Sequence, residues 1–254
     1  MASHASYVIL GRGRWAKRMH SILSGEGRKV SSIEEARALE NETESHHLFR
    51  LANAFRASHA EIAWLCVSPG PHVPALIETA LDAGLHVIVE KPWYGSAEIT
   101  QRLVQRAREK KLLIAVHYEY CLLDEVEDWK RRLSPGCGLQ FSARFFLTRP
   151  DHSGIPALDN LGTHLFSIRA FAVPESTVID ISCAYELPDE RIVRITGENQ
   201  LDESIDLFSQ KQPIIQRFFQ KCEAALDGAA FSLDLNFALR VSQDLNRFRE
   251  AQRR

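Results

Sequence analysis

The chain has 254 residues, a formal net charge of −2 and 25% charged residues. This length suffices for one large domain or two modest ones, and the balanced charge gives no indication of a nucleic-acid or membrane partner. No apolar run approaches the roughly 20 residues of a spanning helix, and none resembles a signal-peptide core, so we expect a cytoplasmic protein. The five cysteines form no C-x-x-C motif, which predicts buried, reduced thiols rather than disulfides or metal ligands. They are Cys66, Cys121, Cys137, Cys183 and Cys222.

Residues 6–10 (SYVIL) predict a short buried strand, and a helical pattern runs from residue 14 to about residue 23. The sequence between them, GRGRWA, matches G-x-G-x-x-G/A with a strand before it and a helix after it. Gly11 permits the tight turn, Gly13 leaves room for a diphosphate, and Ala16 keeps the helix close to the strand. Because free N–H groups at a helix start attract anions, this stretch predicts a dinucleotide site. The plain alternative is an ordinary glycine turn.

Residues 29–33 (KVSSI) predict the second strand. In NAD sites an acidic residue near this point binds the ribose 2′-hydroxyl, and Glu34 suits that role. Ser31 or Ser32, together with an arginine of the glycine turn, would suit the 2′-phosphate of NADP instead. Solvated loop side chains are the third possibility. The balance leans to NADP, with NAD left open.

Residues 34–58 are polar and helix-prone, with apolar side chains at helical spacing. His46 and His47 are adjacent, so they point in different directions and do not form a metal site. We expect both side chains to be solvated.

The central stretch, residues 61–96, predicts a strand-helix-strand unit of a parallel sheet. Two continuous apolar runs, residues 62–67 and 85–89, suit strands buried on both faces. The helix between them covers about residues 73–83, with Gly84 at the position of a C-terminal cap.

Glu90, Lys91 and Pro92 follow the second of these strands. In open parallel sheets, ligands bind beyond the carboxyl ends of the strands, so this tripeptide is the expected chemical centre. The plain alternative is a solvated loop lysine with an ordinary surface ion pair.

After the central stretch, residues 97–108 predict an amphipathic helix and residues 112–116 another buried strand. The strand ends at His117, Tyr118, Glu119 and Tyr120, which either face a substrate or pack in the core. Residues 124–133 predict a further helix.

From residue 139 onward strand-type segments dominate, which predicts an open, largely antiparallel sheet. An apolar helical segment, residues 157–171, lies between its first two strands, and two amphipathic helices close the chain. The expected fold class is α/β: a Rossmann-type, doubly wound domain over residues 1–120, and a smaller α+β domain over residues 121–254. The expected strands are residues 140–147, 177–186, 191–196 and 204–209, and the closing helices are residues 213–226 and 233–248.

Taken together, these motifs resemble the Gfo/Idh/MocA family of NAD(P)-dependent oxidoreductases. The resemblance covers nearly the whole chain. It rests on GRGRWA after the first strand, VSPGPH after the fourth, IVEKP after the fifth and LDNLGTH in the second domain. The last two motifs, in this order and at this separation, are its most specific part.

The resemblance implies that Lys91 lies beside the nicotinamide and the reacting oxygen, and that His164 is the histidine of the family's D-x-G-x-H pattern. Glu90 would hold the cofactor or the lysine. The implied substrate contacts are Lys91, Tyr118, Asn160 and His164. The implied cofactor contacts are Gly11, Arg12, Gly13, Arg14, Trp15, Ser32, Ser68, Pro69, His72, Glu90 and Lys91.

This set suits hydride transfer, because an alcohol carbon that gives up hydride also needs a group to accept its hydroxyl proton. His164 titrates near neutrality and suits that role. Lys91 would polarise the developing alkoxide as a cation, or act as the acid and base if its pKa were lowered. The plain alternative for His164 is a core histidine satisfied by backbone groups.

The chain departs from the family pattern at several points. Asn160 stands in place of the aspartate four residues before His164, and His72 comes one place early in VSPGPH. The common arginine after the sixth strand is absent. The second domain is also short, so a homo-oligomer built on it is doubtful.

Three functions follow in order of preference. The first is an NAD(P)-dependent oxidoreductase acting on a sugar, polyol, amino sugar or related carbonyl compound. The second is a non-catalytic NAD(P)-binding regulator or partner protein, suggested by Asn160 and the short sheet. The third is an imine or carbonyl reductase of a specialised biosynthetic pathway. We expect a small-molecule substrate, and neither nucleic acid nor metal.

Overall fold

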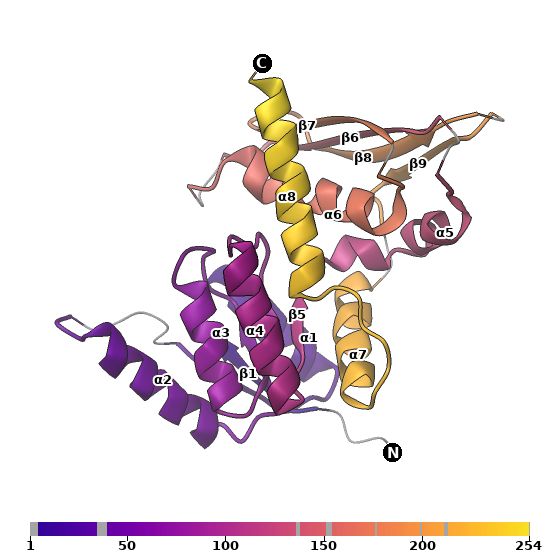
Figure 1. Ribbon diagram of the computed structural model, residues 1–254. Coiled ribbons are helices and arrows are strands. Elements are labelled where there is room, and N and C mark those ends of the chain that lie inside the picture. The colour runs from indigo at the N-terminus through magenta and orange to yellow at the C-terminus, as the bar shows by residue number, and fades with distance from the viewer. Residues whose placement is uncertain are drawn as a thin grey trace. The chain divides into compact units, whose positions relative to one another are not determined.

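The computed structural model describes residues 5–34, 40–135, 138–150, 154–175, 177–198, 200–210 and 213–253 (Figure 1). The chain divides into two compact units. The first contains Met1–His117 and Phe219–Leu239, and the second contains Tyr118–Phe218 and Arg240–Arg254. The two C-terminal helices, α7 (Ile214–Leu226) and α8 (Leu235–Gln252), each contribute residues to both units.

The first unit is built on a parallel sheet of five strands in the order β2-β1-β3-β4-β5. The continuous apolar runs form its buried strands, as expected from their composition. The fold class predicted for this part is therefore confirmed. The strands are β1 (Tyr7–Leu10), β2 (Val30–Ile33), β3 (Ile62–Leu65), β4 (His86–Val89) and β5 (Ile114–Val116).

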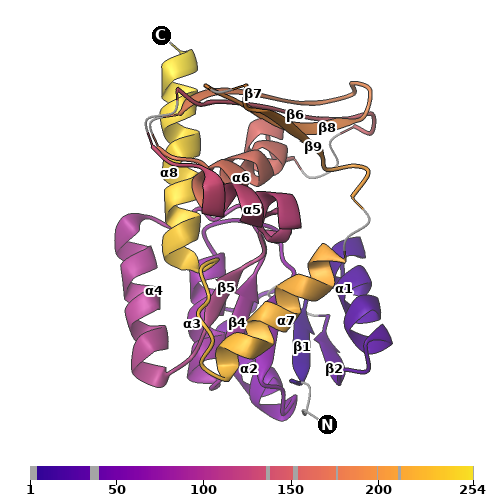
Figure 2. The same ribbon diagram turned by 90° about the vertical axis from the view of Figure 1, so that its right-hand side faces the viewer.

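Helices cover both faces of this sheet (Figure 2). Helices α2 (Glu44–Ala57), α3 (Val73–Asp82) and α4 (Ala97–Lys110) lie on one face, and α1 (Arg14–Gly25) lies on the other. The Ser96 hydroxyl accepts a hydrogen bond from the Ile99 amide and caps the start of α4. Gly84 follows the end of α3 with φ +84°, the left-handed conformation that favours glycine.

Two details of the predicted first domain are wrong. VSPGPH follows the third strand of the described residues and IVEKP the fourth, because residues 40–58 contribute only helix α2 to this stretch. His47 is buried rather than solvated, since its Nδ1 lies 3.4 Å from Glu42 Oε2 and 3.1 Å from Arg50 Nη2. His46 is exposed, as expected.

The later part of α7 is hydrogen-bonded to Tyr7 of β1 and to Arg28, which lies just before β2. Arg28 donates from Nε and Nη2 to the Glu223 carboxylate at 2.7 and 2.8 Å, and the Tyr7 hydroxyl donates to it at 2.9 Å. Arg28 also lies 4.2 Å over the Phe219 ring. Burial and the Glu223 carboxylate raise the pKa of Tyr7, so its hydroxyl remains a neutral donor.

The second unit contains a four-stranded sheet in the order β7-β6-β8-β9. Strands β6 and β7 are parallel and the other pairs are antiparallel, which confirms the predicted, largely antiparallel sheet. Helices α5 (Asp124–Arg132) and α6 (Thr163–Ala172) lie on one side of it (Figure 2). The strands are β6 (Gln140–Leu147), β7 (Val178–Tyr185), β8 (Glu190–Thr196) and β9 (Asp202–Asp206), and a short 3₁₀ helix, η1 (Glu119–Leu122), precedes α5.

The predicted helix over residues 157–171 begins as a π-helix, η2 (Leu158–Gly162), before it continues as α6. The later residues of α8 hold this segment from one side. Arg249 pairs with the Asp159 carboxylate, and the Phe248 ring lies 5.4 Å from that of Phe166. Because π-helical turns inside helices are frequent at functional sites, η2 draws attention to the residues it carries.

Cys66, Cys121, Cys183 and Cys222 are free thiols, and Cys137 lies outside the described residues. Burial raises the pKa of Cys121 and of Cys183 to about 12, so neither is a thiolate at neutral pH. Across the parts of the chain that the structure describes, no helix combines the length and apolarity needed to cross a bilayer.

Candidate functional site

The turn between β1 and α1 has the shape and charge of a diphosphate cradle. Gly11 has φ +136°, and a Cβ atom there would lie 2.4 Å from the carbonyl oxygen of Cys66, so glycine is required. Gly13 caps the start of α1, and a Cβ atom there would have no atom within 4 Å. Arg12 and Arg14 are exposed, and the first turn of α1 contains no acidic residue. These residues fit the diphosphate of a dinucleotide.

A second cluster lies where the strands of the same sheet end, around the Glu90 carboxylate. Its Oε1 accepts hydrogen bonds from Trp15 Nε1 at 2.7 Å and from Trp64 Nε1 at 2.9 Å. His117 Nδ1 lies 3.3 Å from Oε1 and 3.4 Å from Oε2. The imidazole also contacts both indoles, with ring centroids 5.8 Å from Trp15 and 5.2 Å from Trp64. The Glu90 side chain is only 12% exposed.

Two opposing effects decide the charge of Glu90. Burial favours the neutral acid, but the interaction with His117 and the hydrogen bonds from His117, Trp15 and Trp64 favour the carboxylate. The second group is the stronger, so the pKa of Glu90 lies below its ordinary value of 4.5. Glu90 is therefore an anion at neutral pH.

The cluster joins the ends of four neighbouring strands. Trp15 follows β1, Trp64 belongs to β3, Glu90 follows β4 and His117 follows β5. Lys91 comes directly after Glu90, is partly exposed, and precedes Pro92 through a cis peptide bond. The Glu90 carboxylate thus connects Trp15, which follows the glycine turn, to the segment that contains Lys91. These contacts hold the Glu90 carboxylate in place, and its role toward a cofactor stays a prediction.

The other residues expected to contact the cofactor lie at the same edge of the sheet. Ser68, Pro69 and His72 occupy the segment between β3 and α3, and the His72 imidazole covers Gly70. Ser32 is exposed near the end of β2.

The choice between NAD and NADP depends on β2 and the residue that follows it. The Ser31 hydroxyl donates to the carbonyl oxygen of Tyr7 at 3.4 Å, which leaves Ser32 and Glu34 as the exposed candidates. Residues 35–39 lie outside the described residues.

In the second unit, η2 and α6 place two further predicted residues close together. The Asn160 side chain donates from Nδ2 to the Tyr185 hydroxyl at 2.7 Å. One turn later, the His164 ring lies 5.0 Å from the Tyr120 ring and 5.5 Å from the Phe145 ring, and the residue is 8% exposed. The histidine is thus held between aromatic rings, with the amide of Asn160 nearby in the chain.

Tyr118 differs from the other expected substrate contacts because it is 0% exposed. Burial raises the pKa of its hydroxyl, which therefore stays protonated at neutral pH. Its contact with a substrate stays a prediction. The same holds for the joint action of Lys91 and His164, which belong to different units.

Sequence reasoning missed Trp64, Tyr185 and Phe145, and it left His117 open between a site residue and a core residue. Trp64 carried a usable signal, because a buried indole N–H requires a hydrogen-bond acceptor and the strand around it is wholly apolar. The sequence contains no such signal for Tyr185 and Phe145, since only the register of the second sheet places them beside η2 and α6.

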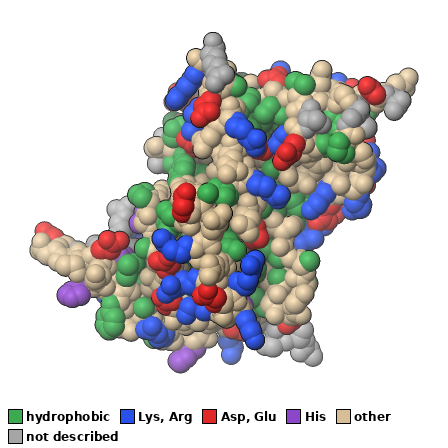
Figure 3. Space-filling view, in the orientation of Figure 1, with side chains coloured by type: hydrophobic (Ala, Val, Ile, Leu, Met, Phe, Trp, Pro, Cys, Tyr) green, Lys and Arg blue, Asp and Glu red, His purple; other side chains and the backbone are tan. Residues whose placement is uncertain are grey.

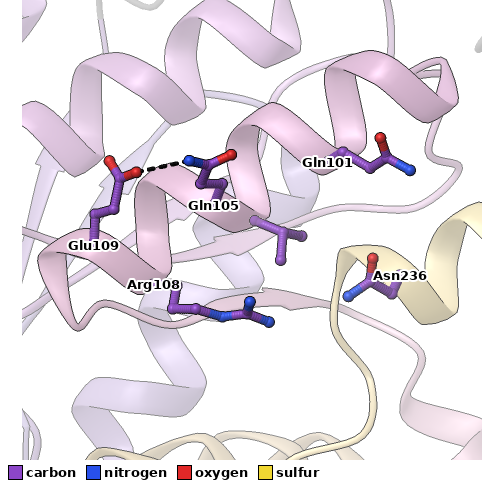
Figure 4. A pocket seen from close by; sticks show the side chains of 6 residues that line it. Gln101, Gln105, Arg108, Glu109 and Asn236 are labelled. Carbon is purple, nitrogen blue, oxygen red and sulfur yellow. Dashed lines mark hydrogen bonds between the residues drawn. The ribbon is translucent and has the colours of Figure 1, made fainter.

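A hollow of about 530 Å³ lies elsewhere on the first unit, along α4 (Figure 4). It is lined by Gln101, Gln105 and Arg108 of α4 and by Asn236, and the Gln105 side chain turns to Glu109, to which it donates at 2.9 Å. The hollow contains none of the predicted site residues.

The surrounding surface mixes both signs of charge (Figure 3). Arg102 pairs with Glu78 at 3.0 Å and Arg106 with Asp82 at 2.6 Å, which joins α3 to α4. Such exposed pairs contribute little to stability.

The parallel sheet, the glycine turn and the strand-end cluster define the first unit as an NAD(P)-binding Rossmann domain. Residues 6–118 match the family described as "Oxidoreductase family, NAD-binding Rossmann fold" (GFO_IDH_MocA). Residues 6–118, just under half of the chain, are therefore a Rossmann domain of the Gfo/Idh/MocA type.

Individual proteins of known sequence or structure also resemble this chain. Mouse biliverdin reductase A is 24% identical over 170 residues, which are 66% of this chain and 57% of that protein. UDP-N-acetylglucosamine 3-dehydrogenase GnnA from Acidithiobacillus ferrooxidans has a similar structure, with a TM-score of 0.75 and 16% identity over 98% of this chain and 97% of GnnA. The WlbA dehydrogenase from Thermus thermophilus, solved with NAD and UDP-GlcNAcA, gives a TM-score of 0.71 and 13% identity over 96% and 94% of the two chains. At these identities the structural likeness concerns the fold alone.

Proposed function

We propose that this protein transfers hydride between NAD(P) and the CH–OH or C=O group of a sugar, polyol, amino sugar or related compound. The observation that carries the proposal is the 2.7 Å hydrogen bond from Trp15 to Glu90. This hydrogen bond joins the start of α1, directly after the turn suited to a diphosphate, to Glu90, the residue before Lys91. A cation beside a nicotinamide is what hydride transfer to or from an oxygen-bearing carbon requires.

Each side chain then has a defined task. Bound NAD(P) supplies the hydride acceptor or donor. The Lys91 ammonium stabilises the negative charge that develops on the substrate oxygen. The His164 imidazole accepts the hydroxyl proton during oxidation and returns it during reduction. Glu90 acts through Trp15, His117 and the backbone of Lys91 rather than on the substrate.

For the cofactor, the exposed Ser32 and the exposed Arg12 favour NADP, whereas the exposed Glu34 would serve NAD. We lean to NADP because a serine and an arginine together suit a 2′-phosphate. WlbA is named as a complex with NAD, and so is GenD2 from gentamicin A biosynthesis, which matches this fold with a TM-score of 0.74 and 15% identity over 97% of this chain and 93% of GenD2. Parallel titrations with NADH and NADPH decide between the two.

The second unit is the proposed substrate domain. It carries His164 and Asn160 on η2 and α6, against the inner face of its sheet. The names of GnnA and of the WlbA complex, which both refer to UDP-sugars, support a sugar-type substrate.

The Gly13→Val variant tests the cofactor site. A side chain at Gly13 begins in open space and its backbone is extended (φ −69°, ψ 172°), so valine is tolerated by the fold. The same side chain would fill the space of the diphosphate, and we expect NAD(P)H to bind at least about 10-fold more weakly, since each 1.4 kcal/mol of lost contact is tenfold. Fluorescence titration measures the affinity, and thermal melting checks the fold.

Arg108→Val, on the exposed face of α4, is the matched control and should bind NAD(P)H like the wild type. Equal affinity of the Gly13→Val variant and the wild type would contradict the cofactor site. Tight NAD(P)H binding without turnover on a panel of sugars, polyols and carbonyl compounds would instead favour a non-catalytic regulator.

A further inference from the structure

Arg191 occupies an unusual position on the inner face of the second sheet. It is the cross-strand partner of Phe145, and its guanidinium carbon lies 5.1 Å from the Phe145 ring. On another side it lies 5.1 Å from the Phe208 ring, which is 60% exposed. Two aromatic rings therefore hold the guanidinium in place without reducing its charge.

Within the described residues, the Arg191 side chain has neither an ion pair nor a hydrogen bond. Its Nε is buried without an acceptor. Asp189, two residues earlier, accepts hydrogen bonds from the amide and the hydroxyl of Thr148 at 2.6 and 3.1 Å, and its charge interacts with that of Arg191 without a hydrogen bond between the two side chains. An arginine that is partly withdrawn from water and has a buried Nε–H without an acceptor has lost solvation that the nearby charge of Asp189 only partly offsets.

The arginines on the opposite face of the same sheet provide the contrast. Arg194, three residues further along β8, donates to Asp202 at 2.7 and 2.6 Å. Arg144 pairs with Glu190 at 3.4 Å. The arginines of the outer face thus form direct ion pairs with carboxylates, whereas Arg191 forms none with the described residues of the inner face.

Phe145 links Arg191 to the proposed chemistry. The same ring that contacts the guanidinium lies 5.5 Å from the His164 imidazole, in a tilted arrangement of 31°. Arg191 and His164 therefore flank one side chain in one unit. A ligand that contacts His164 from this face would have a planar, always charged donor group within its reach.

We propose that Arg191 is an anion-recognition residue that binds a phosphate or carboxylate group of the ligand handled at His164. This deepens the proposed function, and rests on it, by assigning an anionic substrate class. The guanidinium offers two parallel N–H donors to the oxyanion, which a lysine at the same place would not. The neutral part of the ligand would then lie toward the His164 ring.

The test observes the Arg191 side chain itself by NMR, in protein saturated with NADPH or NADH so that the diphosphate turn is filled. The Nε–H signal of Arg191 is assigned by its loss in Arg191→Met and recognised by its ring-current shift from two phenyl rings. Inorganic pyrophosphate is titrated as the phosphate probe and citrate as the carboxylate probe. Arg194→Met, on the outer face, is the matched control.

We expect at least one of the two anions to shift the Arg191 signal in a saturable way. Arg191→Met should weaken that binding about 10- to 100-fold, as expected for a hydrogen bond to a charged group, and Arg194→Met should leave it unchanged. The responding anion tells phosphate from carboxylate recognition. If neither anion shifts the Arg191 signal at any concentration at which the protein remains folded, or if both shift the Arg191 and Arg194 signals alike, the proposal is wrong.

This result is independent of turnover. Anion binding at Arg191 in a protein that transfers no hydride would contradict the proposed function alone. Hydride transfer with an unresponsive Arg191 would contradict only the anion site.

Discussion

The Lys91→Met variant is expected to lower kcat by about 10²- to 10⁴-fold, the range for losing a group that stabilises charge or moves a proton in the transition state. Methionine keeps the length of the side chain and removes the ammonium. The affinity for NAD(P)H should change little, because we expect the turn after β1 to hold the diphosphate. Steady-state rates on a substrate found by panel screening, with NAD(P)H titrations alongside, measure both quantities.

Lys110→Met is the matched control, because Lys110 is an exposed residue of α4 that forms an ion pair with Asp82 of α3 at 3.3 Å. It should leave kcat unchanged. A Lys91→Met enzyme that keeps the wild-type kcat would show that the lysine of the strand-end cluster has no part in the reaction.

The second large effect is expected at Glu90. Alanine there leaves two indole N–H groups and the His117 ring without their shared acceptor, in a place that is almost dry. Each buried group that loses its partner costs about 1–3 kcal/mol, so Glu90→Ala should lower the free energy of unfolding by about 3 kcal/mol or more. Urea denaturation measures this change.

Glu90 also predicts a pH dependence with a defined sign. Its pKa is lower in the folded protein than the ordinary 4.5, so the carboxylate stabilises the fold above pH 4.5. That stabilisation is lost as the pH falls from 4.5 through the folded pKa. Glu90→Gln keeps an acceptor for the indoles but cannot ionise, so its stability should fall less steeply in this acid range.

A purely structural role would affect only stability. Glu90 holds Trp15, which directly follows the glycine turn. We therefore also expect Glu90→Ala to bind NAD(P)H more weakly at a temperature where this variant is fully folded. Glu90→Gln should recover most of that affinity. Two variants that bind NAD(P)H like the wild type would show that Glu90 does not position the turn.

Much of the first unit could be predicted because its signals are local. The apolar runs before Gly11 and Glu90 became buried parallel strands, and Gly84 took the left-handed conformation expected after a helix. These outcomes depend on neighbouring residues only, which is why composition and spacing sufficed.

The contacts of the site could not be predicted in the same way. Trp15, Trp64 and His117 lie 75, 26 and 27 residues from Glu90 along the chain, and only the strand order brings them together. The burial of His47 likewise depends on Glu42, which belongs to the segment before α2. Propensity and periodicity contain no information on such pairings.

Arg191 is an intermediate case. The residues of β8 alternate, with Val193 and Ile195 buried on the inner face and Arg194 exposed on the outer. Arg191 shares the period of the two buried residues, so an arginine at an inward position was visible in the sequence. Its two aromatic neighbours were not, since Phe145 and Phe208 come from other segments.

The central claim is that the glycine turn and the residue after Glu90 serve one nicotinamide site. A crystal structure of the protein with bound NADPH or NADH tests it most directly. The account predicts the diphosphate over Gly13 and the nicotinamide ring beside the Lys91 ammonium, with the His164 imidazole facing the same space. A dinucleotide bound away from Gly13, or a nicotinamide ring remote from Lys91, would contradict it.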